Sequence, residues 1–101
     1  DLAGAIRLLD EAAEAEPENA EAFHYRGMVK TNQRDFQAAV ADLEKAVALD
    51  PSRAYSHYYL GLAYHGIRRP DKMAEHLNAF VSHAPDAPDA DKVRSVLKAF
   101  R

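Results

Sequence analysis

The stretch SHYYLGLAYHGIRR, residues 56–69, brings three tyrosines and two histidines close together. Histidine binds metals and moves protons near neutral pH, and tyrosine can serve as an acid or as a stacking surface for nucleobases. The stretch could therefore be a metal site, a catalytic site, a nucleic-acid surface or the wall of a binding groove. The rest of the chain decides among these four.

The spacing of the histidines does not indicate a metal site. They are His24, His57, His65, His76 and His83. No two are three or four residues apart, and the metal-binding pattern H-E-x-x-H does not occur. His24 and His65 could approach each other across neighbouring helices, but neither has an obvious carboxylate partner. Since the chain also has no cysteine, we predict no metal and no other cofactor.

A catalytic nucleophile is missing as well. The four serines, at positions 52, 56, 82 and 95, lie in no strained turn of the kind that exposes a nucleophile. The four glycines form no phosphate-binding loop, and Gly27 and Gly61 are expected where two paired helices approach closely. Acidic pairs such as Glu14 and Glu16 belong to a charged surface and not to a pocket. We predict that the chain is not an enzyme.

The overall charge argues against a nucleic-acid partner. A formal net charge of -3 does not favour binding to phosphates. No apolar run approaches the roughly 20 residues that a membrane-spanning helix needs, so membrane insertion is not expected. No signal peptide is visible, and the compartment is left open between cytoplasm and periplasm.

A repeat with a constant period runs along the chain. Pro17, Pro51 and Pro85 are evenly spaced, since 51 − 17 = 34 and 85 − 51 = 34, and the same offset places Gly27 on Gly61. Adding 34 to the numbers of the opening residues aligns them with the second half of the first full copy. The chain therefore contains two full copies after an incomplete one.

Each copy is expected to form two helices, because its apolar residues recur with a period of 3.6. One such stripe consists of His57, Leu60, Gly61 and Tyr64. Breaks are expected at residues 33–35 and 68–70 and at each periodic proline. Pro70 is expected at the first position of its helix, and Asp35 and Ser52 are expected as N-caps.

These features resemble the tetratricopeptide repeat, a 34-residue helix-turn-helix unit with a recurring aromatic, Leu-Gly, Tyr, Ala and Pro pattern. The first full copy supplies Phe23, Gly27, Ala39, Leu43 and Pro51, and the second supplies Leu60, Gly61, Tyr64, Leu77 and Pro85. The nearest alternative is a 35-residue pentatricopeptide array, which reads RNA. The spacing of 34 and the terminal prolines count against it.

The copies also depart from the pattern at four positions. Arg26 and Lys30 stand where the pattern has Leu and Tyr, and Met73 and Phe80 stand where it has small residues. A buried guanidinium needs a partner, and Asp42 on the paired helix is within reach. We predict an ion pair between Arg26 and Asp42.

The resemblance implies an all-α fold: a tetratricopeptide-repeat α-solenoid, which is a right-handed superhelix of antiparallel helix pairs. Residues 1–101 are then a single domain. It is divided into the second helix of an incomplete repeat (1–16), two repeats (20–51 and 54–85) and a capping helix (88–101). The capping helix carries an apolar stripe of Ala90, Val93, Leu97 and Phe100, which seals the last repeat.

In the family, one stripe of each first helix lines a concave groove that binds ligands. The matching residues are Glu21, His24, Met28, Thr31, Tyr55, Tyr58, Leu62 and His65, with Asp89, Lys92 and Val96 added by the capping helix. Tyrosine and methionine are typical anchors of interfaces. The resemblance thus implies binding of a peptide or protein segment in an aromatic, weakly charged groove.

Two alternatives stay open beside this interpretation. The eight groove positions of the two full repeats hold no Lys, Arg or Asn, so the clamp by which some family members bind a C-terminal carboxylate is not carried over. The segment could instead be the structural end of a longer array, used for self-assembly or spacing. Arg34, Arg68 and Arg69 recur at the inter-helix turns and could form a rim for an acidic segment or a phosphate, or a solvated surface.

The first helix leads to an expectation about assembly. The face carrying Leu2, Ala5, Ile6 and Leu9 would pack against a first helix that the chain does not contain. We expect part of this face to lie in water and to be frayed or covered by another chain, as in a homo-oligomer. The parent protein is then expected to extend N-terminally by at least one helix.

Overall fold

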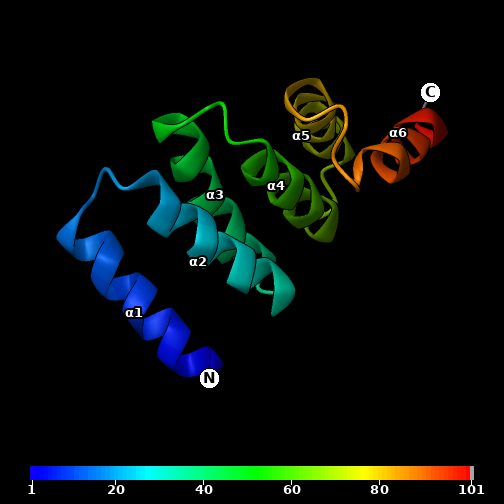
Figure 1. The fold of residues 1–101 in the computed structure, drawn as a ribbon. Coiled ribbons are helices and arrows are strands. Elements are labelled where there is room, and N and C mark those ends of the chain that lie inside the picture. Colours follow the sequence, from blue (N-terminus) through cyan, green and yellow to red (C-terminus); the bar gives the residue numbers. More distant parts are fainter. Residues whose placement is uncertain (101) are drawn as a thin grey trace.

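The computed structural model describes residues 1–100, and within that range the chain is entirely helical apart from turns. The six helices are α1 (Leu2–Ala15), α2 (Ala20–Asn32), α3 (Phe36–Leu49), α4 (Ala54–Gly66), α5 (Pro70–His83) and α6 (Ala90–Ala99). They form a row in which α2 and α3, and then α4 and α5, are antiparallel pairs (Figure 1). The N-terminal and C-terminal helices lie at opposite ends of the row (Figure 1). The predicted all-α fold is confirmed.

The repeated prolines follow the ends of α1, α3 and α5. These helices end at Ala15, Leu49 and His83, each two positions before a proline. Proline disfavours the helical conformation for the residue before it and lacks the N–H of the helical ladder, so each helix ends there. Pro70 occupies the first turn of α5, as predicted, because its missing N–H has no partner at that position anyway.

One of the two predicted N-caps is wrong. Asp35 does take the N-cap position of α3, although its side chain makes no capping hydrogen bond. Ser52 does not cap α4, because that helix starts at Ala54 and Arg53 occupies the cap position. The N–H and the hydroxyl of Ser52 both donate to Asp50 Oδ1, at 3.2 and 2.7 Å. Asp50 therefore holds Ser52 in the preceding turn.

The turns inside the two helix pairs have the same backbone. Arg34 and Arg68 have positive φ angles of 65° and 62°. The amide of Arg34 donates to Thr31 O at 3.0 Å, and that of Arg68 to His65 O at 3.1 Å. This geometry satisfies carbonyls at a helix end, although a left-handed conformation costs a residue other than glycine about 1 kcal/mol.

The two packing glycines lie where predicted. A Cβ on Gly27 would lie 2.4 Å from Leu43 Cγ, and one on Gly61 would lie 2.7 Å from Leu77 Cδ2. No side chain fits such distances without moving its neighbour. The absence of a side chain therefore lets each first helix approach its partner.

The predicted ion pair between Arg26 and Asp42 is confirmed. Two guanidinium nitrogens of Arg26 donate to the two oxygens of Asp42 at 2.9 and 2.8 Å. A third donates to Asp10 at 2.8 Å, and Lys30 reaches Asp42 at 2.9 Å. Donation to Asp42 raises the pKa of Arg26 above its ordinary value. Both departures from the family pattern in α2 thus form one polar network that joins α1, α2 and α3.

The hydrophobic core is concentrated in α3 to α6. Leu43, Leu60 and Phe80 are among its largest fully buried side chains. In α1 only Ala13 is buried. On the predicted face Leu2 is 50% exposed, whereas Ala5, Ile6 and Leu9 are half-buried, and Leu8, which is 65% exposed, lies outside that face. The expectation that part of the face lies in water is confirmed at Leu2, and its covering by another chain stays a prediction.

Candidate functional site

A groove opens between α4 and α6, with α5 as its floor. It has a volume of about 260 Å³. Its lining consists of Tyr58, Leu62 and His65 from α4, Met73 and Leu77 from α5, and Lys92, Val93, Val96 and Phe100 from α6 and its end. Five residues predicted to line a groove are brought together here: Tyr58, Leu62, His65, Lys92 and Val96.

The groove exists because α6 packs on α5 while α4 and α6 stay apart. In the described part of the chain the backbones of α4 and α6 do not come into contact, whereas those of α2 and α4 do. A hydrogen bond spans the gap from Tyr55 Oη to Asp89 Oδ2, at 3.0 Å. Burial and this bond raise the pKa of Tyr55.

Large side chains on α5 explain the wider spacing. At the repeat offset of 34, Met73 and Phe80 take the places of Ala39 and Ala46 in the second repeat. Phe80 is fully buried, and its ring lies 5.0 Å from that of Tyr55. Because interiors are close-packed, the larger side chains hold the next helix further away than alanines would.

The floor and walls of the groove are apolar. Met73 and Leu77 are buried, while Leu62, Val96 and Phe100 are 36%, 37% and 51% exposed. These three make up half of the large hydrophobic side chains exposed on residues 1–100. Apolar side chains gathered at one hollow, and not scattered singly, are typical of a binding surface.

Tyr58 belongs partly to the core. The centre of its ring lies 5.5 Å from the ring centre of Tyr55 and 5.1 Å from that of Phe80. Tyr58 is therefore itself buried, and it forms the inner edge of the groove. Burial raises the pKa of Tyr58, which therefore stays protonated. The polar rim consists of His65 and Lys92, both exposed.

The groove does not extend over α2, contrary to expectation. His24 is buried, and its Nδ1 forms a 2.8 Å hydrogen bond with Ser56 Oγ of α4. Burial lowers the pKa of His24, which disfavours the charged ring. Thr31 is also buried and donates to Gly27 O at 2.8 Å. The prediction that these two residues line an open groove is wrong, because α2 and α4 pack closely there.

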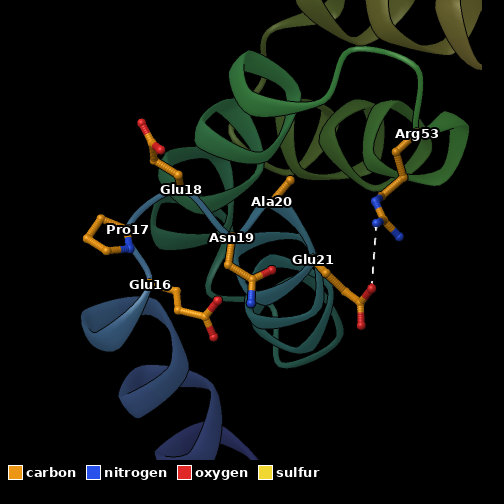
Figure 2. Close-up of a pocket in the computed structure, with 7 residues that line it drawn as sticks. All are labelled: Glu16, Pro17, Glu18, Asn19, Ala20, Glu21 and Arg53. Carbon is orange, nitrogen blue, oxygen red and sulfur yellow. Dashed lines mark ion pairs between the residues drawn. The ribbon is translucent and has the colours of Figure 1, made fainter.

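Glu21 and Met28 lie away from the α4–α6 groove. Met28 is half-buried on α2. Glu21 is exposed at the start of α2 and approaches Arg53 at 3.8 Å across a wide hollow above the α1–α2 turn (Figure 2). The hollow has a volume of about 640 Å³, and Glu16, Pro17, Glu18, Asn19 and Ala20 complete its lining. Its three carboxylates and open shape offer no enclosed site for a ligand.

A pair of buried histidines in the second repeat was not predicted from the sequence. His57 Nδ1 lies 3.1 Å from His76 Nδ1, and His57 Nε2 lies 2.9 Å from the carbonyl oxygen of Pro51. A signal was present, since the repeat offset places His76 on Asp42, and Asp42 is the residue predicted to face the paired helix. Searching only for histidines three or four positions apart could not find a pair on two helices.

Neither a cluster of three metal-binding side chains nor a membrane-spanning helix is found among residues 1–100. Among residues 1–100 no group of three His, Asp or Glu side chains could hold a metal ion. Over the same range, no helix combines the length and the apolar character needed to cross a bilayer.

The comparisons with known proteins agree with the architecture. The family model described as tetratricopeptide repeat matches residues 32–98, which is more than half of the chain. The chain belongs to the tetratricopeptide repeat family. The crystal structure of MamA is similar, with a TM-score of 0.71 and 23% sequence identity, over 99% of this chain and 78% of that chain. At this identity the likeness concerns the fold alone.

Membership in the tetratricopeptide repeat family confirms the predicted fold class, an α-solenoid built of helix pairs. It also supports the general function of a protein-interaction module. The tetratricopeptide repeat fold by itself does not select the surface that binds.

Proposed function

We propose that this tetratricopeptide repeat chain binds a peptide or protein segment in the groove between α4 and α6. The chain would act as one domain, in which residues 20–51 and 54–85 are the full repeats and 88–101 the cap. The observation that carries the proposal is the apolar groove of about 260 Å³ whose lining includes three exposed apolar side chains.

Each part of the groove has a role in this proposal. Leu62 and Val96 supply apolar walls from opposite helices, and Met73 and Leu77 supply the floor. An apolar side chain of the partner that fills the groove removes both surfaces from water, which stabilises the complex by about 25 cal/mol per Å². Tyr58 shapes the inner edge.

The rim and the flanking residues set the orientation of the bound segment. His65 and Lys92 stand on opposite helices and offer polar contacts beside the apolar groove. Tyr55 acts indirectly, because its bond to Asp89 fixes α6. Among the other predicted residues, Met28 and Glu21 would touch only a partner that continues along α2 toward the N-terminal end.

Selection of peptides from a random display library tests this proposal. Peptides are selected on the wild-type chain and then measured against Leu62→Asp, Val96→Asp and the control Leu8→Asp, which changes an exposed leucine far from the groove. We expect the groove variants to weaken the selected peptides by at least tenfold, because a carboxylate enters an apolar contact. The control should bind as the wild type does.

Two outcomes would contradict the proposal. If Leu8→Asp abolishes binding while Leu62→Asp and Val96→Asp do not, the binding surface is on α1. If all three folded variants bind equally, the peptides use neither surface. Circular dichroism of each variant shows that the helical fold is retained.

Self-assembly through α1 is the second candidate function. Leu2 and Leu8 are exposed on the first helix, and such apolar surface tends to be covered by another surface. Sedimentation velocity of the wild type and of Leu8→Asp tests it. Self-association that disappears in the variant supports this function, and a monomeric wild type at all concentrations contradicts it.

A further inference from the structure

Two buried histidines join the helices of the second repeat, on residues that the proposed groove does not use. His57 of α4 and His76 of α5 are both buried, and their Nδ1 atoms lie 3.1 Å apart. The other nitrogen of His57 lies 2.9 Å from the carbonyl oxygen of Pro51 in the α3–α4 turn. The contacts thus form a chain from this turn through α4 to α5.

The hydrogen atoms in this chain can be placed from the chemistry of the groups. A carbonyl oxygen only accepts, so the Nε2 of His57 carries a hydrogen and donates to Pro51. The Nδ1 of a neutral His57 is then bare and accepts. His76 must donate through Nδ1–H, and its own Nε2 is bare when that ring is neutral.

Carboxylates surround the bare nitrogen of His76. Its Nε2 lies 3.6 Å from Glu75 Oε2 on the same helix and 4.0 Å from Glu44 Oε1 on α3 of the preceding repeat. The hydroxyl of Tyr64 on α4 donates to Glu44 and holds that side chain in place. A first added proton therefore enters at His76 Nε2, facing two acids, without disturbing the bond between the rings.

Stacking and one further cation complete the surroundings. The ring of Tyr64 stacks on His76 at 5.7 Å, and the ring of the exposed His83 stacks on His57 at 5.6 Å. Lys72 on α5 opposes a positive charge on His76. Burial is the strongest influence and lowers the pKa of His76, while Glu44 acts in the opposite direction.

A second added proton has no acceptable place. It would enter at His57 Nδ1 and bring two N–H groups head to head at 3.1 Å, both on cationic rings. One of the rings then has to turn or move apart. The pair tolerates one added proton but not two.

We propose that the His57–His76 pair is a pH-sensitive joint within the second repeat, closed near neutral pH and opened in mild acid when both rings become cationic. Opening separates α4 from α5 and weakens the link from α5 to Glu44 on α3. Since α4 and α5 supply one wall and the floor of the groove, opening would also lower peptide affinity. That last effect rests on the proposed function, whereas the opening itself does not.

Nitrogen-resolved NMR of the histidine rings tests the joint directly. In the wild type at neutral pH we expect His57 with its hydrogen on Nε2 and His76 with its hydrogen on Nδ1. In Glu44→Gln the titration midpoint of His76 should fall, because a carboxylate that favours the charged ring is lost. His83→Gln is the matched control and should leave His76 unchanged. Reversed hydrogens, or a His76 midpoint that Glu44→Gln does not shift, would overturn the proposal.

Hydrogen exchange measures the opening. After correction for intrinsic exchange rates, the protection of amides in α4 and α5 should fall by at least about tenfold between pH 7.5 and 5. In His57→Gln the amide protection should fall much less, and in the control His83→Gln it should fall as much as in the wild type. Equal loss in wild type and His57→Gln would overturn the joint. The expected loss of protection without any loss of peptide affinity would count against the proposed groove alone.

Discussion

The junction between α2 and α4 is closed, and the junction between α4 and α6 is open. At the closed junction a buried histidine, His24, bonds to Ser56 across the helices at 2.8 Å. At the open one, Tyr55 reaches Asp89 at 3.0 Å and a groove lies beside that bond. At the closed junction the first helices of the two repeats meet. At the open junction the first helix of the second repeat faces the capping helix.

The difference follows from residues in matching positions. With the offset of 34, His24 corresponds to Tyr58 and its partner Ser56 corresponds to Ala90. Ala90 has no hydroxyl to accept or donate a bond, so the polar link of the first junction cannot form at the second. On α5, Met73 and Phe80 stand where α3 has the small residues Ala39 and Ala46. One repeat pattern therefore gives a sealed junction and an open groove.

The largest expected effect concerns the side chain that holds the open junction apart. Phe80→Ala should lower the free energy of unfolding by about 3–5 kcal/mol, because a fully buried aromatic ring is replaced by a cavity. Urea unfolding followed by circular dichroism measures it. Leu8→Ala, at an exposed position, is the control and should change the free energy of unfolding little. A loss below about 1 kcal/mol in Phe80→Ala would mean that α6 collapses into the space and that the groove closes.

The next effect breaks the closed junction. Ser56→Ala removes the partner of His24 and leaves the buried Nδ1 without a hydrogen bond. The free energy of unfolding should fall by about 1–2 kcal/mol. The double variant His24→Ala/Ser56→Ala completes a cycle. If the two changes are additive, the bond across the junction contributes nothing by itself.

The pH dependence of stability should distinguish the two junctions. Because the folded pKa of His24 is lowered by burial, the unfolded chain binds more protons, and stability is lost as pH falls below the unfolded pKa of about 6.5. The slope contributed by one such group cannot exceed about 1.4 kcal/mol per pH unit. Thermal unfolding from pH 7.5 to 5 should show a smaller slope in His24→Asn than in the wild type. An equal slope would assign the pH dependence to other groups, the His57–His76 pair among them.

The smallest effect is expected at the bond that spans the open junction. Tyr55→Phe removes the hydroxyl that donates to Asp89 and should lower the free energy of unfolding by about 0.5–1 kcal/mol. Faster amide exchange should appear in α6 and not in α2. Exchange that increases equally in both helices would show that the bond does not act on the open junction in particular.

The sequence by itself determined the repeat and the features that its period dictates. The spacing of 34 located the helices through their prolines, placed Gly27 and Gly61 at close approaches, and selected the tetratricopeptide repeat family. The bond between Arg26 and Asp42 was also predictable, because a guanidinium in an apolar column needs an acid opposite.

The tertiary structure decided which predicted residues can meet a partner. Helical periodicity gives the direction in which His24, Thr31, Tyr58 and Leu62 point, but not the distance to the neighbouring helix. That distance depends on how side chains from several helices fill the space between them, so His24 is sealed while Leu62 faces a groove. The His57–His76 pair was hidden for the same reason, since a contact between two helices leaves no local spacing in the chain.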